Sequence, residues 1–171
     1  MARFARPAPD WPRFLGPPPA HARARAEPED FQVTELPLVE PDGEGTHLWL
    51  EVSKRNANTR WVAARLAEQA GAAVRDVGYA GMKDRRGVTT QWFSVGLQEA
   101  ANDDWARWEI PGVTIQRAAR HGRKLQRGAL KGNRFRITLR DLRGEASAVE
   151  ERLSMLADQG LPNALGALAV A

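Results

Sequence analysis

The stretch GYAGMKDRRGVTTQWFSV, residues 78–95, combines a glycine-bracketed charged segment with a strand pattern. Residues 77–80 are short and apolar, and residues 81–87 are charged, with a glycine at each end. Such glycines favour a loop between regular elements. Residues 91–97 have the composition of a strand. The sequence therefore predicts a loop, with Asp84 at its centre, that leads into a strand.

Two further strands are expected before this stretch. Residues 31–38 have a strand composition, and in residues 47–54 the apolar Leu48 and Leu50 alternate with polar neighbours. The turn-rich segment 40–45 separates the two. A hairpin is the pairing that this arrangement suggests.

Two helices are expected from their end signals. The first begins at Asn58 or Thr59, which are good N-cap residues, and ends at Gly71. The second covers residues 146–158 and ends at Gly160. Its apolar positions fall on one face and predict a buried stripe made of Ala146, Val149, Leu153 and Leu156.

Strands are also expected at residues 113–118 and 134–140. In the second of these, apolar residues such as Phe135 alternate with arginines, so one face is suited to lie along a phosphate backbone. An ordinary half-exposed strand is the alternative. Because strands and helices do not alternate strictly, the fold class is predicted to be α+β, with a mixed or antiparallel sheet and flanking helices.

Length and composition exclude several classes of protein. The chain has 171 residues, 43% of them hydrophobic, with no cysteine and 3 histidines. A disulfide scaffold, a cysteine nucleophile and a cysteine-based metal site are therefore excluded, and no metal or cofactor is expected. No segment has the length or apolarity of a membrane span or signal peptide, so a soluble, cytoplasmic protein is expected. Residues 1–29, rich in Pro, Ala and Arg, predict a flexible arm ahead of a domain at 30–171.

Charge is unevenly distributed along the chain. Residues 27–51 hold eight acids and no Lys or Arg, whereas residues 117–143 hold ten basic residues and one acid. A basic block on a folded segment is typical of a protein that binds a polyanion such as nucleic acid. A solvated face in an Arg-rich protein is the other interpretation.

Asp84 is the candidate for chemistry. Its neighbours Lys83 and Arg85 favour the ionised carboxylate, which can serve as a nucleophile or a base. A turn aspartate in surface ion pairs is the structural alternative.

Residues 78–95 closely resemble the signature of the TruD family of tRNA pseudouridine synthases. Four more segments resemble motifs of that family, in its order and spacing. They are PEDFQVTE (28–35), DGEGTH (42–47), KRNANT (54–59) and HGRKLQRGALKGNRF (121–135).

The resemblance implies an enzyme that isomerises a uridine of tRNA to pseudouridine, typically uridine-13 of the D-arm, without a cofactor. It assigns the catalytic role to Asp84 and substrate contacts to Phe31, Asn133 and Phe135. An aromatic ring offsets the stacking that a flipped base loses, and an amide can hydrogen-bond to a uracil edge. Core packing for the phenylalanines, and a turn role for Asn133, are the alternatives.

Five basic residues complete the predicted RNA-binding set, and they are expected to hold phosphates rather than to read sequence. They are Lys83, Arg123, Lys124, Arg127 and Lys131.

The resemblance ends after LPN (161–163), so the expected fold is an incomplete pseudouridine synthase catalytic domain. An uncovered sheet edge is then expected to favour self-association. The predicted function is a TruD-type tRNA pseudouridine synthase with tRNA as its partner. Two alternatives are a truncated, inactive relative that still binds RNA and a basic ribonucleoprotein component.

Overall fold

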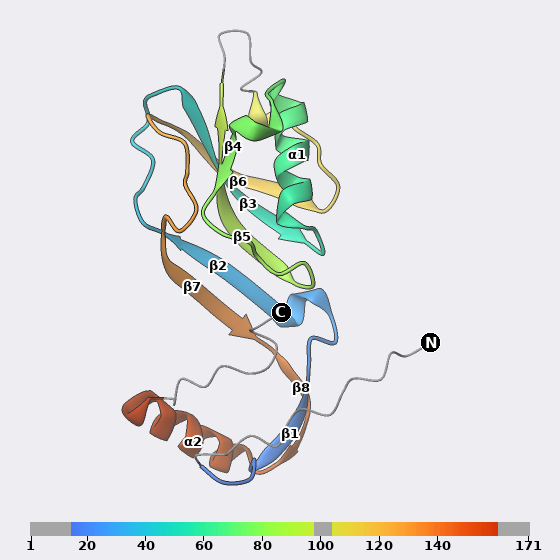
Figure 1. The fold of residues 1–171 in the computed structure, drawn as a ribbon. Helices are drawn as coiled ribbons and strands as arrows, with labels where there is room; N and C mark the ends of the chain where they lie inside the picture. Colours follow the sequence, from blue (N-terminus) through green and yellow to red (C-terminus); the bar gives the residue numbers. More distant parts are fainter. Residues whose placement is uncertain (1–14, 98–103, 161–171) are drawn as a thin grey trace. The chain divides into compact units, whose positions relative to one another are not determined.

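The computed structural model describes residues 15–97 and 104–160, which form two compact units. One unit spans residues 24–140, and the other joins residues 15–23 to residues 141–160. The α+β class predicted from the sequence is confirmed (Figure 1). The larger unit contains β2 (Phe31–Pro37), β3 (His47–Arg55), α1 (Thr59–Ala70), β4 (Val77–Tyr79), β5 (Val88–Gly96), β6 (Val113–His121) and β7 (Leu130–Ile137).

A six-stranded mixed sheet organises the larger unit. Its strand order is β6-β3-β5-β2-β7, with β4 paired to β5. β2 runs parallel to β5, and the other pairings within this sheet are antiparallel. The predicted hairpin of β2 and β3 is wrong, because β5 lies between them. The connection at residues 38–46 runs instead to the end of β6, where the Gly43 N–H donates to the Arg120 carbonyl at 2.9 Å.

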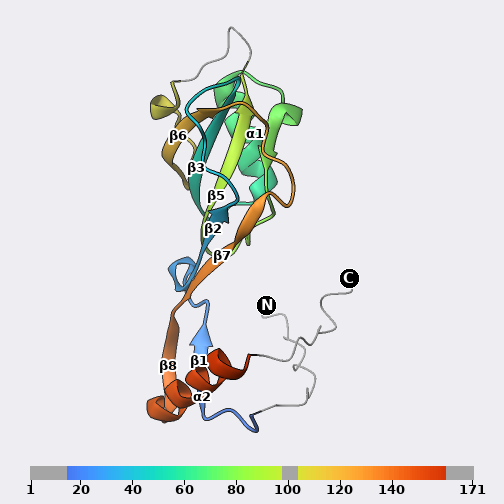
Figure 2. The same ribbon diagram turned by 90° about the vertical axis from the view of Figure 1, so that its left-hand side faces the viewer.

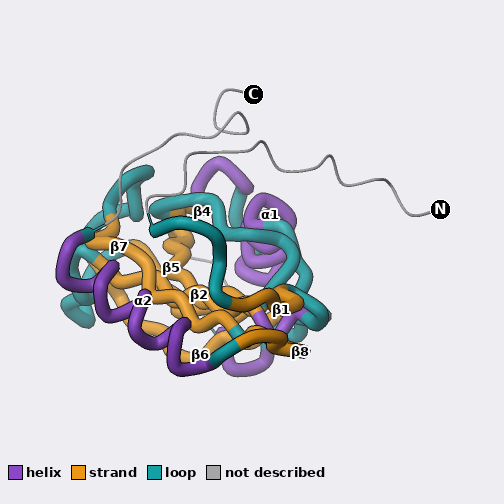
Figure 3. Tube along the Cα trace, turned by 90° about the horizontal axis from the view of Figure 1, so that it is seen from below, coloured by secondary structure: helices purple, strands orange, loops and turns teal. Residues whose placement is uncertain are grey.

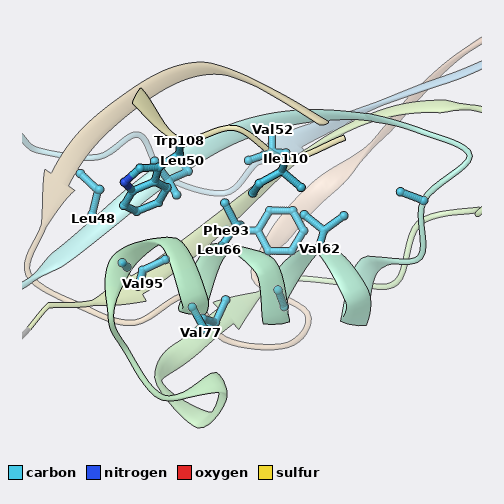
Figure 4. Packing of buried hydrophobic residues seen from close by; sticks show 14 residues of the cluster. Leu48, Leu50, Val52, Val62, Leu66, Val77, Phe93, Val95, Trp108 and Ile110 are labelled. Carbon is cyan, nitrogen blue, oxygen red and sulfur yellow. The ribbon is translucent and has the colours of Figure 1, made fainter. Parts of the chain in front are cut away.

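Helix α1 covers one face of this sheet. Asn58 caps its first turn, with Oδ1 accepting from the Arg60 N–H at 2.9 Å, and Gly71 ends it at φ 67°. Both end signals expected from the sequence are confirmed. The helix packs on β4 and β5 (Figures 2 and 3), and Val62 and Leu66 are fully buried against Phe93 and its neighbours (Figure 4).

The segment between β6 and β7 contacts a second, smaller core. Trp49, Trp92 and Leu125 are buried there. The Leu125 N–H donates to Ser94 Oγ at 2.8 Å. A Cβ at Gly78 would overlap the Leu125 carbonyl oxygen, so only glycine permits this close approach.

Strand β7 ends the sheet and is exposed. The single strand expected at residues 134–140 is instead the end of β7 and the start of β8 (Leu139–Gly144). The chain leaves the ladder at Thr138, whose N–H donates to the Asp30 carbonyl at 2.8 Å. Phe135 and Ile137 are more than half exposed.

The smaller unit contains most of a two-stranded sheet, β1 (Ala20–Ala24) with β8, and α2 (Ala146–Gln159). The prediction of a flexible arm is therefore wrong for residues 20–24, which form a strand. Their order comes from pairing with β8, which is distant in sequence, and local composition does not show this pairing. Residues 1–14 lie outside the described residues. The expected second helix is confirmed, but its predicted buried stripe is wrong. No described residue of α2 is buried, and Leu153 is 61% exposed.

Neither α1 nor α2 has the length and apolarity needed to cross a membrane, and the described residues form no other α-helix. Residues 161–171, which include the LPN segment, lie outside the described residues.

Candidate active site

Asp84 lies in the loop between β4 and β5, as the sequence predicts, with its side chain 48% exposed. Its carboxylate faces the guanidinium of Arg25, with Oδ1 and Nη1 3.6 Å apart. An exposed carboxylate with one cation beside it is accessible to a substrate. Arg25 comes from residues that the sequence analysis assigned to the arm.

Buried Lys54 holds the backbone at Asp84. The Lys54 ammonium donates to the carbonyls of Asp84 and Ala57, both at 2.8 Å. Burial, with a smaller contribution from the nearby Lys83, lowers the pKa of Lys54 to about 8 against the opposing attraction of Asp84. The lysine therefore ties the loop to the end of β3 and the start of α1.

A chain of buried hydrogen bonds fixes the rest of the loop. The Lys83 N–H donates to Thr59 Oγ1 at 3.1 Å, and that hydroxyl donates to Gln91 Oε1, also at 3.1 Å. The Gln91 amide in turn donates to the Gly81 carbonyl at 3.1 Å. The backbone of three loop residues, Gly81, Lys83 and Asp84, is thus held by hydrogen bonds. The Asp84 side chain therefore projects from a fixed backbone position.

Lys83 points inward rather than toward solvent. Its ammonium lies 2.6 Å from Glu35 Oε2, and the two side chains are 6% and 1% exposed. Glu35 also accepts from the Trp92 N–H at 3.2 Å. The prediction that Lys83 contacts RNA is therefore corrected. Its ammonium is buried in an ion pair with Glu35 and is not accessible to a phosphate.

Two predicted substrate-binding phenylalanines come together beside the aspartate. The rings of Phe31 and Phe135 lie 6.0 Å apart between centroids and are tilted by 51°. The Arg25 guanidinium lies 3.6 Å from the centroid of the Phe31 ring. Phe31 is buried and Phe135 is 56% exposed, so Phe135 offers the larger free aromatic surface.

Asn133 lies on the same strand as Phe135, two residues before it. It pairs with Glu35 in the β2–β7 register and is exposed. Alternation along a strand places residues two apart on one face, so Asn133 and Phe135 share a face of β7. Four residues predicted from the sequence come from neighbouring parts of the sheet. Phe31 is in β2, Asn133 and Phe135 are in β7, and Asp84 is in the loop before β5.

The predicted phosphate-binding residues lie in the segment that joins β6 to β7 and at the start of β7. This segment is attached close to the Asp84 loop. The Gly128 N–H donates to the Ala80 carbonyl at 2.8 Å, directly before the loop begins. Arg127 donates to the Tyr79 hydroxyl at 2.9 Å. Lys124 donates to the carbonyl of Arg75 and is half-buried, whereas Arg123 and Lys131 are exposed.

Acidic and basic blocks of the sequence pair with each other in part. Arg117 lies 2.7 Å from Glu40, and Arg140 lies 2.8 Å from Asp30. The hydrogen bond from Arg140 holds the pKa of Asp30 below its usual value. Internal ion pairs therefore neutralise Arg117 and Arg140 of the basic block. Its middle contains cations with no ion pair to a described residue: Arg123, Lys131, Arg134 and Arg136.

Sequence reasoning missed Arg25, Lys54 and Glu35. For Lys54 a signal was present, since it follows Leu48, Leu50 and Val52 at the next inward position of an alternating strand. A charged residue at an inward position has to be paired or hydrogen-bonded. Arg25 carries no comparable local signal, because its contacts are tertiary.

An exposed carboxylate held on a fixed loop, beside an arginine and an aromatic pair, defines a site for carboxylate chemistry on a planar substrate. Comparison with known proteins identifies the family to which this site belongs. Residues 14–167 match the family described as tRNA pseudouridine synthase D (TruD). The tRNA pseudouridine synthase D of Nitrosococcus oceani is 51% identical over 151 residues, covering 88% of this chain and 42% of that protein.

The tRNA pseudouridine synthase D of Methylococcus capsulatus is 48% identical over 157 residues, covering 92% of this chain and 44% of the relative. A crystal structure of a TruD protein from Methanosarcina mazei superimposes with a TM-score of 0.72 at 29% identity, covering 85% of this chain and 34% of that chain. The chain thus spans about two-fifths of the length of these curated relatives. It belongs to the TruD family, and the resemblance noted in its motifs is confirmed.

Proposed function

We propose that this protein takes part in isomerising a uridine of tRNA, uridine-13 of the D-arm, to pseudouridine, with Asp84 as the catalytic carboxylate. One observation carries the proposal: the half-exposed Asp84 side chain stands on a loop held by buried hydrogen bonds, beside Arg25 and the Phe31 ring. Family membership supports the reaction class. We also place the reaction in the cytoplasm, as the sequence suggests.

The reaction needs one carboxylate and no external oxidant or reductant. The bond between uracil N1 and ribose C1′ breaks, the base turns, and a bond forms between C5 and C1′. The proton on C5 then leaves, and N1 takes up a proton, so that atoms and electrons balance. Asp84 can act by attacking C1′ or by removing a proton from the sugar to give a glycal, and both routes use an ionised carboxylate.

The aromatic pair is proposed to hold the flipped base. A base that leaves its stack gains about 1–3 kcal/mol from an aromatic side chain. Phe135 is more than half exposed and is proposed to stack on the base. The buried Phe31 ring packs against Phe135 and supports its position. Asn133, on the same face of β7, is proposed to hydrogen-bond to the uracil edge.

Arg25 is proposed to orient the Asp84 carboxylate until substrate arrives. Its guanidinium covers the Phe31 ring in this structure, and entry of a uracil ring requires that it shift. Arg123, Lys124, Arg127 and Lys131 are proposed to contact phosphates, whereas Lys83 is proposed to position the loop through Glu35.

Tritium release from tRNA labelled at uracil C5 tests the proposal. That hydrogen leaves only when the new carbon–carbon bond forms. We expect release with the wild-type chain and none with Asp84→Asn, which preserves side-chain shape but removes the charge. Release that persists in Asp84→Asn would contradict the catalytic assignment.

Salt dependence of tRNA binding tests the phosphate contacts separately. Replacing Arg123 by Ala is expected to lower the slope of log affinity against log salt by about 1. Arg107→Ala is the control, since Arg107 is paired with Asp104 at 3.0 Å. Salt-sensitive binding without tritium release would favour an inactive RNA-binding relative, and an unchanged slope in Arg123→Ala would reject the proposed phosphate contact.

Exposed apolar residues at the edge of the sheet support a proposal of self-association. Phe135 and Ile137 of β7 are 56% and 52% exposed. β7 pairs with β2 on one side only among the described strands. An exposed apolar edge strand offers unpaired backbone groups to a second copy. Sedimentation velocity over a range of protein concentrations tests this, and a monomer at every concentration would contradict it.

A further inference from the structure

A cavity of about 390 Å³ is lined by residues from the end of β3, the start of α1 and the Asp84 loop. Its lining includes neither Phe31 nor Phe135. Its volume falls in the range typical of small-ligand sites. Arg85, the residue after Asp84, contributes to it. The lining consists of Arg55, Asn56, Ala57, Asn58, Trp61, Arg85 and Pro111.

Trp61 is the unusual residue of this cavity. It stands in the first turns of α1, where its neighbours Val62 and Ala63 are buried, yet its own side chain is 41% exposed. The exposed part of the indole gains no burial energy on folding and is free to contact a ligand. An exposed indole in a cavity with cations is the usual arrangement for stacking a nucleobase.

The two arginines of the cavity differ in their partners. Arg55 is paired with Glu29, whose carboxylate accepts from Nε at 2.6 Å, so its charge is already balanced. Arg85 is exposed and makes no ion pair with a described residue. The lining thus includes one cation without an ion pair to a described residue, an indole and the polar residue Asn56.

We propose that this cavity binds an RNA nucleotide close in sequence to the target uridine. Its base stacks on Trp61, and its phosphate pairs with Arg85. The proposal rests on the proposed function, since it takes the RNA that presents a uridine to Asp84 as the ligand. Because Arg85 directly follows Asp84 in a rigidly held loop, a phosphate bound there would fix the position of the strand relative to the carboxylate.

Affinity for an unmodified, fluorescently labelled tRNA transcript tests the site. Trp61→Ala is expected to weaken binding by about 5- to 150-fold, the range set by loss of one base–aromatic stack. Trp61→Phe keeps an aromatic face and is expected to retain most of the affinity. Arg85→Ala is expected to lower the salt slope by about 1. Arg65→Ala is the control on the same helix, since Arg65 is paired with Glu68 at 2.7 Å outside the cavity.

Fluorescence supplies a readout that does not depend on turnover. Stacking is expected to quench Trp61, so the quench on adding tRNA should shrink in Trp61→Phe although binding persists. Wild-type affinity in Trp61→Ala, or an unchanged quench in Trp61→Phe, would overturn the inference. Failure of the proposed function appears differently: no tritium release from the wild-type protein, with the effects of Trp61 and Arg85 on RNA binding intact.

Discussion

Helices α1 and α2 carry similar apolar stripes and both end at a glycine, but their surroundings differ. In α1, Val62, Leu66 and Ala70 are completely buried. In α2, Leu153 is 61% exposed, and no described residue of the helix is buried. The pattern of a helix shows which face is suited to burial, whereas the presence of a covering partner depends on the rest of the fold.

The strands of the sheet show the same contrast. Phe93 of β5 is fully buried beneath α1, whereas Phe135 of β7 is 56% exposed. The covered part of the sheet includes β3 and β5, and it holds the Asp84 loop in place. The exposed part belongs to the edge strand that contributes Phe135 and Asn133. The chain therefore contains a firmly supported loop that carries Asp84, and an edge strand, β7, that lacks cover among the described residues.

The largest expected effect comes from the buried ion pair of the covered region. Lys83→Met leaves Glu35 buried without its partner and is expected to cost about 3–5 kcal/mol in the free energy of unfolding. Urea denaturation measures this. The double variant Glu35→Leu with Lys83→Met is the control and should recover much of the loss. A single variant as stable as the wild type would show that the pair is not buried in solution.

Leucines in the two helices provide a direct test of the comparison. Leu66→Ala in α1 removes a fully buried side chain and is expected to cost about 2–5 kcal/mol. Leu153→Ala in α2 is expected to change stability by no more than about 0.5 kcal/mol. Equal losses in the two variants, measured by urea denaturation, would show that α2 is covered in solution.

Lys54 makes the stability of the covered region depend on pH. Its pKa in the folded protein, about 8, lies below the 10.5 of a free lysine, because burial disfavours the charged form. Between these values the unfolded chain binds more protons, so the stability of the wild type should rise with pH from about 8 to 10.5 relative to Lys54→Met. We expect a change on the order of 3 kcal/mol, from about 1.4 kcal/mol for each unit of the pKa difference. A difference between the two proteins that stays constant over this range would contradict the lowered pKa.

The smallest effect on stability is expected at the exposed edge. Phe135→Ser removes an apolar ring that is mostly in water, so the free energy of unfolding should change by about 0.5 kcal/mol or less. Self-association measured by sedimentation should weaken, because the apolar edge is interrupted. A marked loss of stability would show that Phe135 packs more tightly in solution than its exposure indicates.

Local patterns were sufficient to predict many elements of this fold. Alternation located β3, strand composition located the end of β5, and Asn58 and Gly71 located the ends of α1. The loop that carries Asp84 was also predicted, because glycines bracket a charged segment. Each of these signals comes from neighbouring residues, whose spacing and backbone preferences are visible in the sequence.

Pairing and burial were not predictable in the same way. The order β6-β3-β5-β2-β7, strand β1 and the exposure of α2 all depend on segments far apart in the chain. At the candidate site, Lys83 is adjacent to Asp84 in the sequence and was predicted to be an exposed cation that contacts RNA. The structure turns its ammonium to Glu35 and brings Arg25 to the carboxylate instead.

By itself, the sequence determined the fold class, the family motifs and the identity of the candidate carboxylate. These follow from residue types and spacings that are local along the chain. Only the tertiary structure decided which cation faces Asp84, that Phe31 and Phe135 lie together, and that Lys54 supports the loop from within. The physical reason is that ion pairs, ring contacts and burial depend on distance in space, and folding brings together residues as far apart as Phe31 and Phe135.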